Sequence, residues 1–290
     1  MHTNLVILAG GASSRMKKQV ESEGLTTEEI AQANTRSKGL ISVGTDNRPL
    51  IDYLLYNAKS AGYKNIYIII GENDVLFKQY YGEKDRDNTF NGLNISYAIQ
   101  YIPKGRVKPY GTADALLQAV EQYPELKKET YSVCNSDNLY SQEVLSVLRS
   151  NANNNAFISY ARSALDFPQE RISRFALVNM DESGYLINIV EKPKPEIIDS
   201  FRDSTGELRV SMNIFKFNGE QFYPYLKECP INIERDEKEI PSALINMIND
   251  YPKSVFGIPV SEHVPDLTAK SDILAVKEYL KKYYTTTLWK

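Results

Sequence analysis

The sequence predicts an α/β protein in which a mostly parallel, mixed central sheet lies between layers of helices. Five short runs of apolar, β-branched or aromatic residues, each bounded by turn residues, indicate strands at 4–10, 65–71, 94–100, 131–137 and 155–161. Helical patterns, with apolar residues at three- and four-residue spacing, occupy 50–61, 110–122 and 142–150. This alternation favours a three-layer α/β sheet, whose ligands bind beyond the carboxyl ends of the strands.

The pattern changes after residue 161. The stretch RFALVNM at 174–180, the turn DESG at 181–184 and YLINIVEKP at 185–193 predict a hairpin. A strand at 209–217 and a helix with Asn218 as its N-cap follow, then a strand at 254–260 and an amphipathic helix at 272–283. Near the N-terminus, TTEE at 26–29 predicts a capped short helix inside the loosely composed region 17–37. The second half therefore forms a hairpin-containing lobe of a mixed sheet.

Length and composition narrow the class of protein. The 290 residues, 42% hydrophobic and 24% charged, are typical of a soluble globular chain, and we expect one domain rather than two. A net charge of -3 lacks the excess of Lys and Arg that nucleic-acid binders carry. The apolar runs are too short to span a bilayer, and no signal-peptide layout is present. Cys134 and Cys229 match neither a metal-ligand spacing nor a disulfide framework, so we expect a reduced, cytoplasmic protein.

The stretch VILAGGASSRMKK at 6–18 places small residues and cations directly after the first predicted strand. Backbone N–H groups at that edge can cradle phosphates, and Arg15 adds a fork of donors that suits phosphate oxygens. The spacing matches neither GxGxxG nor GxxxxGK[ST], and on its own it also fits an ordinary strand-to-helix turn.

Later stretches, in order, point to a family. LAGGASSRM at 8–16 and SKGLISVGTDNRPLIDYLL from 37 onward resemble the start of the sugar-phosphate nucleotidylyltransferases. Further resemblances are IQYIPKGRVKPYGTADALLQA at 99–119, VCNSDNLYS at 133–141, IVEKPKP at 189–195, SMNIFKF at 211–217 and VPDLTAKSDILAVKEYL at 264–280. Six ordered matches cover nearly the whole chain and are far more specific than any one of them.

The resemblance implies a three-layer, Rossmann-like nucleotidyltransferase fold in one domain over 1–290. It would have a nucleotide-binding half at 1–150, a sugar-phosphate-binding half at 151–265 and a C-terminal helix region at 266–290. It implies Mg²⁺-assisted, in-line transfer of a nucleoside monophosphate from a nucleoside triphosphate (NTP) to a sugar 1-phosphate, with release of pyrophosphate. The implied catalytic residues are Arg15 and Lys38; the nucleotide-binding residues Ala9, Gly10, Gly11, Ala12, Ser13, Gln100, Gly111 and Thr112; the sugar-phosphate residues Glu191, Lys192 and Asn213; and the Mg²⁺ ligands Asp137 and Asp266.

These residue types suit that chemistry. A phosphate monoester is already ionised at neutral pH, so the transfer needs positive charge and positioning rather than a general base, and the chain has only two histidines. Carboxylate oxygens such as those of Asp137 and Asp266 suit Mg²⁺, a hard cation. Each residue also has a simpler interpretation. Arg15 and Lys38 could be surface cations, Asp137 a turn cap, Asp266 a helix-cap partner, and the charges at 191–192 a solvated strand end.

The sequence departs from the family pattern at four places. The linker between Arg15 and Lys38 is long, Ser136 and Asn213 stand where the family has glycine, and 104–110 is a basic insertion that we interpret as a solvated loop rather than a mobile cover. Two other functions stay open. A nucleotide-sugar glycosyltransferase usually carries a DxD motif, and NSDNL supplies one aspartate; a non-catalytic, nucleotide-sugar-sensing relative need not keep Arg15, Lys38, Asp137 and Lys192. The base, the sugar and whether the chain forms a homo-oligomer are not determined by the sequence.

Overall fold

The architecture is a mixed β-sheet between helices, seen in a computed structural model that describes residues 1–18 and 24–289. The strands are β1 (Asn4–Leu8), β2 (Asn65–Gly71), β3 (Asn88–Phe90), β4 (Leu93–Gln100), β5 (Thr130–Asn135), β6 (Asn155–Ala161), β7 (Ala176–Met180), β8 (Leu186–Val190), β9 (Arg209–Asn218) and β10 (Val255–Val260). The α-helices are α1 (Thr27–Thr35), α2 (Leu50–Ser60), α3 (Val75–Tyr81), α4 (Thr112–Gln122), α5 (Gln142–Ser150), α6 (Gln169–Ile172), α7 (Gly219–Lys227), α8 (Ile240–Asp250) and α9 (Asp272–Tyr283). Short 3₁₀ helices cover Lys38–Leu40, Thr45–Asn47, Pro124–Lys127, Arg162–Ala164 and Pro195–Phe201.

The strands of the sheet are parallel in one part and antiparallel in another. Its strand order is β10-β6-β9-β5-β1-β2-β4-β3, with β7 pairing β8 and β9 beside this path. β1 is central and pairs in parallel with β2 and β5, and β2 pairs in parallel with β4. β9 runs antiparallel to β5, β6 and β7, so the second half of the chain joins the sheet in the opposite direction. The predicted mixed α/β sheet and its hairpin, β7 with β8, are confirmed.

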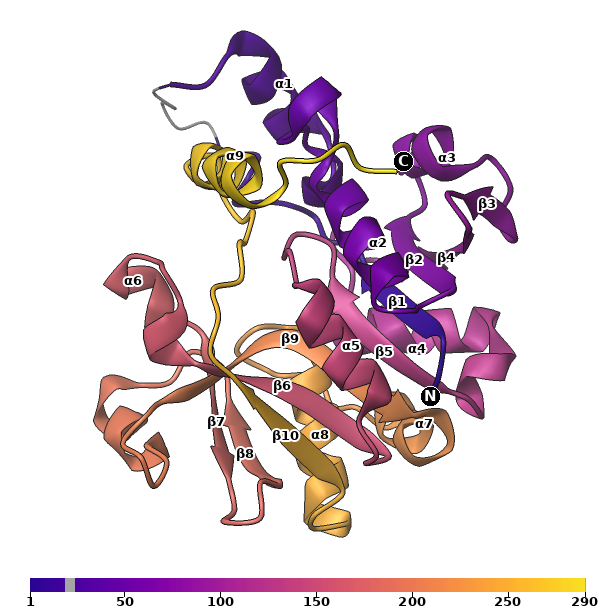
Figure 1. The fold of residues 1–290 in the computed structure, drawn as a ribbon. Helices are drawn as coiled ribbons and strands as arrows, with labels where there is room; N and C mark the ends of the chain where they lie inside the picture. The colour runs from indigo at the N-terminus through magenta and orange to yellow at the C-terminus, as the bar shows by residue number, and fades with distance from the viewer. Residues whose placement is uncertain (19–23, 290) are drawn as a thin grey trace.

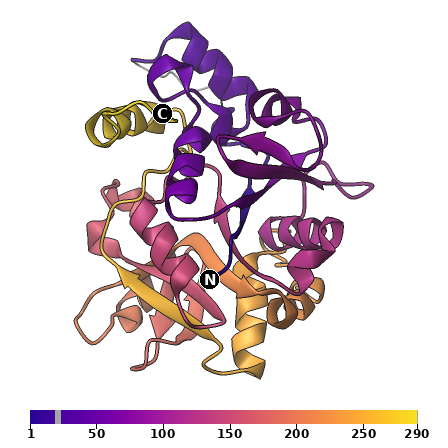
Figure 2. The same ribbon diagram turned by 45° about the vertical axis from the view of Figure 1, so that its right-hand side comes forward.

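Two apolar cores lie on the two faces of the sheet. One contains buried residues of α2, α5 and α9, and the other buried residues of α4, α7 and α8. Figures 1 and 2 show the sheet between these layers, with the C-terminal helix α9 beside the N-terminal region around α1. Lys277 of α9 forms an ion pair with Glu29 of α1, which joins the last helix of the chain to the first.

The element boundaries agree with the sequence expectations where local signals are strong. β2, β6, α5 and α9 match the predicted ranges. Thr26 and Glu29 form the predicted capping box, and the Asn218 side chain accepts a hydrogen bond from the amide of Gln221. The structure also contains α3, β3, α6 and α8, which the sequence reading did not predict. The region 17–37 lies partly outside the described residues.

Two glutamines of α4 protect the exposed edge of β4. The short β3 covers only the first part of that strand. Farther along, the amide of Gln122 accepts from the N–H of Ile99 and donates to its carbonyl, and Gln118 makes the same pair of bonds with Tyr101. Side chains thus replace a neighbouring strand where the edge backbone would otherwise be unpaired. The bonds also fix α4 beside Gln100, at the end of β4.

Within residues 1–18 and 24–289, none of the helices combines the length and apolar character needed to cross a membrane.

Candidate active site

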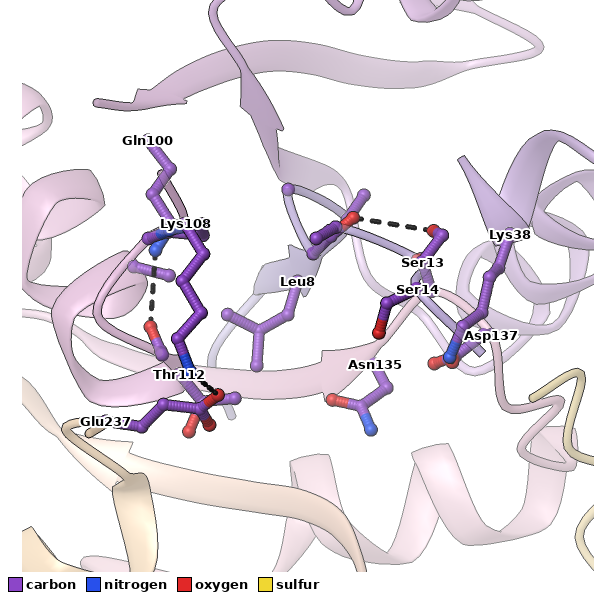
Figure 3. A pocket seen from close by; sticks show the side chains of 18 of the residues that line it. Leu8, Ser13, Ser14, Lys38, Gln100, Lys108, Thr112, Asn135, Asp137 and Glu237 are labelled. Carbon is purple, nitrogen blue, oxygen red and sulfur yellow. Dashed lines mark hydrogen bonds and ion pairs between the residues drawn. The ribbon is translucent and has the colours of Figure 1, made fainter. Parts of the chain in front are cut away.

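A pocket of about 410 Å³ opens at the carboxyl edge of the parallel strands, beside the loop that follows β1 (Figure 3). Eleven of the fifteen residues assigned to the site from sequence line it, and the remaining four, Glu191, Lys192, Asn213 and Asp266, do not. The lining consists of Leu8, Ala9, Gly10, Gly11, Ala12, Ser13, Ser14, Arg15, Lys38, Gln100, Lys108, Pro109, Gly111, Thr112, Ala115, Asn135, Ser136, Asp137 and Glu237.

The loop after β1 turns tightly at the pocket wall. Ser13 is buried with a φ of 55°, and its carbonyl accepts a 3.1 Å hydrogen bond from the amide of Lys17. Met16 is fully buried and anchors the turn in the core, whereas Arg15 is exposed and lines the pocket. The loop therefore presents small residues and one guanidinium to the space beyond β1.

Lys38 and Asp137 form an ion pair in the pocket wall, beside the loop that follows β1. Lys38 Nζ donates to Asp137 Oδ2 at 2.6 Å, with the two side chains only 16% and 17% exposed. Asp137 does not end β5 as expected, because the strand stops at Asn135 and Asp137 follows in the turn. Despite the long linker after Arg15, the chain brings Lys38 into the same pocket.

Ser136 fits beside Lys38 because residue 39 is glycine. A Cβ on Gly39 would lie 3.0 Å from the carbonyl oxygen of Ser136 and 3.1 Å from its Cβ, which is tighter than ordinary contact. Ser136 is therefore accommodated by a glycine on the facing segment.

Asp266 approaches Asp137 from the far end of the chain. The amide of Leu267 donates to the carbonyl of Asp137 at 2.8 Å, and the amide of Leu139 donates to the carbonyl of Pro265 at 2.9 Å. These bonds form a short antiparallel bridge between Asn138 and Asp266. The backbone thus holds the two aspartates next to each other, although they are distant in sequence.

The Asp266 carboxylate is buried and engaged on both oxygens. Thr268 Oγ1 donates to Oδ1 at 2.7 Å, and Arg171 Nη2 lies 2.8 Å from Oδ2. Burial and the negative charge of Asp137 raise the pKa of Asp266, while Arg171 acts in the opposite direction. Asp266 therefore does not cap α9, whose N-cap residue is Ser271. Asp272, the first residue of α9, accepts from the amides of Thr268 and Ala269 in the turn that precedes the helix.

Gln100, Gly111 and Thr112 lie at the other end of the pocket, where the amide of Gln100 donates to the carbonyl of Gly111 at 3.2 Å. Gly111 has a φ of 108°, and a Cβ there would lie 2.7 Å from the carbonyl oxygen of Lys238. Only glycine fits this conformation and this close approach. Thr112 begins α4, and its hydroxyl accepts from the amide of Ile240.

The basic insertion 104–110 is solvated at Lys104, Gly105 and Val107, whereas two of its cations, Arg106 and Lys108, have acidic partners. Arg106 makes a 2.9 Å ion pair with Asp236 and stacks over the ring of Tyr110. Lys108 Nζ lies 3.5 Å from Glu237 Oε1, and both residues line the pocket. The acidic partners come from the segment 232–240 between α7 and α8, which carries no recognisable motif and was missed from sequence.

The predicted sugar-side residues Glu191, Lys192 and Asn213 do not line the pocket, and Glu191 contacts the segment 232–240. Glu191 is 3.6 Å from Arg235, which also pairs with Glu239 at 2.6 Å. Burial raises the pKa of Glu239 to about 7, despite Arg235. Lys192 is exposed and has a φ of 46°. Asn213 lies in β9 next to Ile214, which pairs with Cys134 near the pocket end of β5.

Asp137 and Asp266 supply carboxylate oxygens, the ligand type that a hard divalent cation prefers. Among the residues that the structure describes, no three His, Cys, Asp or Glu side chains gather as a complete metal cage. Mg²⁺, however, is commonly held by one or two carboxylates with the remaining positions left to water and substrate phosphates. Two neighbouring carboxylates, one with a pKa raised by burial and by the other's charge, are a donor set of this kind.

Comparison with known proteins adds two findings. A family model described as nucleotidyl transferase matches residues 4–257. A solved structure of UDP-glucose pyrophosphorylase complexed with UDP-glucose superposes with a TM-score of 0.69 at 16% sequence identity, covering 97% of this chain and 99% of that chain. At this identity the structural similarity establishes the fold, and it agrees with the three-layer architecture described above.

Proposed function

The chain belongs to the nucleotidyl transferase family, and we propose that it transfers a nucleoside monophosphate from an NTP to a sugar 1-phosphate. An oxygen of the sugar phosphate forms a bond to the α-phosphorus, the bond from that phosphorus to the β-phosphate oxygen breaks, and pyrophosphate leaves. The products are a nucleotide sugar and pyrophosphate.

One observation carries the proposal: a single pocket contains the small-residue loop with Arg15, the Lys38–Asp137 pair and, at its other end, Gln100 with Gly111. The loop amides and two cations suit a triphosphate, because they meet negative oxygens with N–H donors and positive charge. The Gln100 side chain offers a donor and an acceptor to a base edge. The arrangement supports a nucleotide bound along the pocket from base to phosphates.

The chemistry requires little beyond positioning and charge. The attacking phosphate is ionised at neutral pH, so no side chain has to remove a proton. Arg15 and Lys38 are assigned to the charge that develops on the phosphoryl oxygens, where preorganised cations are most effective. Asp137 and Asp266 are assigned to hold Mg²⁺, which supplies positive charge to phosphate oxygens when bound.

The sugar 1-phosphate is assigned to the side where Glu191, Lys192 and Asn213 lie. Glu191 accepts hydrogen bonds from sugar hydroxyls, Lys192 offers charge to the phosphate, and Asn213 offers an amide. Arg235, 3.6 Å from Glu191, adds a second cation at this end. The segment 232–240 contacts both ends, because its Glu237 lines the pocket while its Arg235 faces Glu191.

A matrix of NTPs against sugar 1-phosphates, read by pyrophosphate release, tests the proposal and identifies both substrates. We expect release only when a matching pair and Mg²⁺ are present. Absence of release from every pair, with NTP binding intact, would favour a sensing protein instead.

Arg15→Ala provides the matched variant for this assay, with Lys17→Ala as control. Both side chains are exposed near the same turn, but only Arg15 lines the pocket. Arg15→Ala should lose roughly 10²-fold in turnover, as expected for the loss of one electrostatic group, and Lys17→Ala should stay near wild type.

A further inference from the structure

Arg171 connects the lobe added after β6 to the carboxylate pair at the pocket. We propose that Arg171 is a positioning residue, which holds the Asp266 carboxylate beside Asp137 in the orientation that binds a divalent cation. The inference rests on the proposed function in its use of these two aspartates as metal ligands. Arg171 was not among the residues that the sequence assigned to the site, and it lies in α6, a helix that the sequence did not predict.

The guanidinium contacts Asp266 at two points and a second aspartate at a third. Nη2 lies 2.8 Å from Oδ2 of Asp266 and also donates to its main-chain carbonyl at 3.2 Å. Nη1 lies 2.5 Å from Oδ1 of Asp272, the first residue of α9. The side chains of Asp266 and Asp272 are 11% and 12% exposed, so these ion pairs are screened little by water. Only the planar fork of an arginine spans two carboxylates in this way.

The segment that carries Arg171 is itself docked on the C-terminal region. The amide of Asp166 donates to Nδ1 of His263 at 3.1 Å. The ring of Phe167 lies 4.8 Å from the ring of His263, and the Arg171 guanidinium lies over the Phe167 ring at 4.5 Å. These contacts fix the segment from which the Arg171 side chain extends.

Charge explains why Asp266 needs this support. Its carboxylate is buried and is repelled by Asp137, so an unsupported side chain would turn away from its neighbour. Arg171 and Thr268 hold one oxygen each. Both bonds leave a lone pair on each oxygen for a cation. Groups that orient a metal ligand in this manner typically contribute 10- to 100-fold to metal affinity, by the order of magnitude known for such partners.

Arg171→Lys separates orientation from charge. The lysine keeps the positive charge but reaches only one acceptor, so it cannot bridge the two aspartates. Arg171→Met is less informative, because loss of a nearby positive charge by itself strengthens the attraction for a cation. Arg174→Lys is the matched control: Arg174 follows closely in the chain and pairs with Glu170, but that pair is exposed.

Mn²⁺ binding by the purified full-length protein, followed by electron paramagnetic resonance, gives a readout independent of turnover. We expect Arg171→Lys to raise the Mn²⁺ dissociation constant by roughly 10-fold or more, and Arg174→Lys to match the wild type. Thermal unfolding of both variants is recorded in parallel to verify folding. In the background of Asp266→Asn, Arg171→Lys should cause no further loss, since it acts through Asp266.

The outcomes separate this inference from the proposed function. Unchanged Mn²⁺ affinity in Arg171→Lys, when Asp137→Asn abolishes binding, overturns the role of Arg171 and leaves the metal assignment intact. A further loss in the Asp266→Asn background also overturns it, because Arg171 would then act elsewhere. Equal Mn²⁺ binding by wild type and Asp137→Asn overturns both the metal site and this inference.

Discussion

Lys38 Nζ lies 2.6 Å from Oδ2 of Asp137, and the residues beside them in sequence pack so closely that a Cβ on Gly39 would lie 3.0 Å from the carbonyl oxygen of Ser136. A side chain at residue 39 would therefore crowd the backbone next to this ion pair.

Gly39→Ala should displace this pair. The new Cβ would lie 3.0 Å from the Ser136 carbonyl, so one segment must move by a few tenths of an ångström. We expect pyrophosphate release to fall on the order of 10-fold, since a misplacement of about 1 Å in an active site can cost about 10²-fold. Ser136→Gly added to Gly39→Ala removes the crowding at the Ser136 Cβ and should recover part of the rate. A double variant as slow as Gly39→Ala alone would rule out side-chain crowding as the cause.

Asp137→Asn and Asp266→Asn test the carboxylate pair. Each substitution keeps the size of the side chain and one acceptor oxygen but removes one negative charge, so each variant should fold and lose Mg²⁺-dependent turnover. The double variant should be little slower than the poorer single one, because groups that act as a unit are strongly non-additive. Full activity and unchanged Mg²⁺ dependence in Asp266→Asn would leave Asp137 as the protein's single ligand.

Lys192→Ala tests the assignment of the two substrate ends. Lys192 lies outside the pocket that contains the small-residue loop, next to Glu191. We expect its loss to raise the KM for the sugar 1-phosphate several-fold more than the KM for the NTP. Steady-state kinetics with each substrate varied in turn measure both constants, and equal increases would contradict the assignment.

Glu239 should make stability depend on pH. Burial raises the pKa of its carboxyl from the ordinary value of 4.5 to about 7 in the folded protein. Between these values the folded state binds more protons than the unfolded state, so this group's contribution to the free energy of unfolding falls as pH rises. Glu239→Gln removes that effect while keeping an acceptor for Arg235. Urea unfolding at pH 5 and pH 8 should therefore show the variant gaining stability relative to wild type at the higher pH; a difference that does not change with pH would contradict the shift.

The fold was largely predictable because its signals are local. The apolar runs of β2 and β6, the spacing in α5 and the capping box at Thr26 each determine their own element. The element α8 was missed although its residues are apolar, since it follows a charged run without a capping side chain. α6 spans only Gln169–Ile172, too short for a periodic pattern.

Residues of the candidate site were likewise predictable only where they belong to a local sequence pattern. Residues on the loop after β1, at Lys38 and around Gln100 could be found because each belongs to a recognisable stretch, and the structure gathers them in one pocket. Two further residues are positioned by tertiary contacts alone. Glu237 pairs with Lys108, and Arg171 pairs with Asp266 and Asp272. Lys108 belongs to the basic insertion 104–110, but nothing in the sequence indicates which acidic segment faces it.

The central claim, transfer of a nucleoside monophosphate to a sugar 1-phosphate, is tested most directly by following two phosphorus labels of the NTP in one reaction. The account predicts that the α-phosphorus label appears in a nucleotide sugar and the γ-phosphorus label in pyrophosphate, in equal amounts and only when the sugar 1-phosphate is present. Both labels remaining in unreacted NTP with every sugar 1-phosphate, while a nucleotide sugar instead loses its sugar to an acceptor, would contradict it.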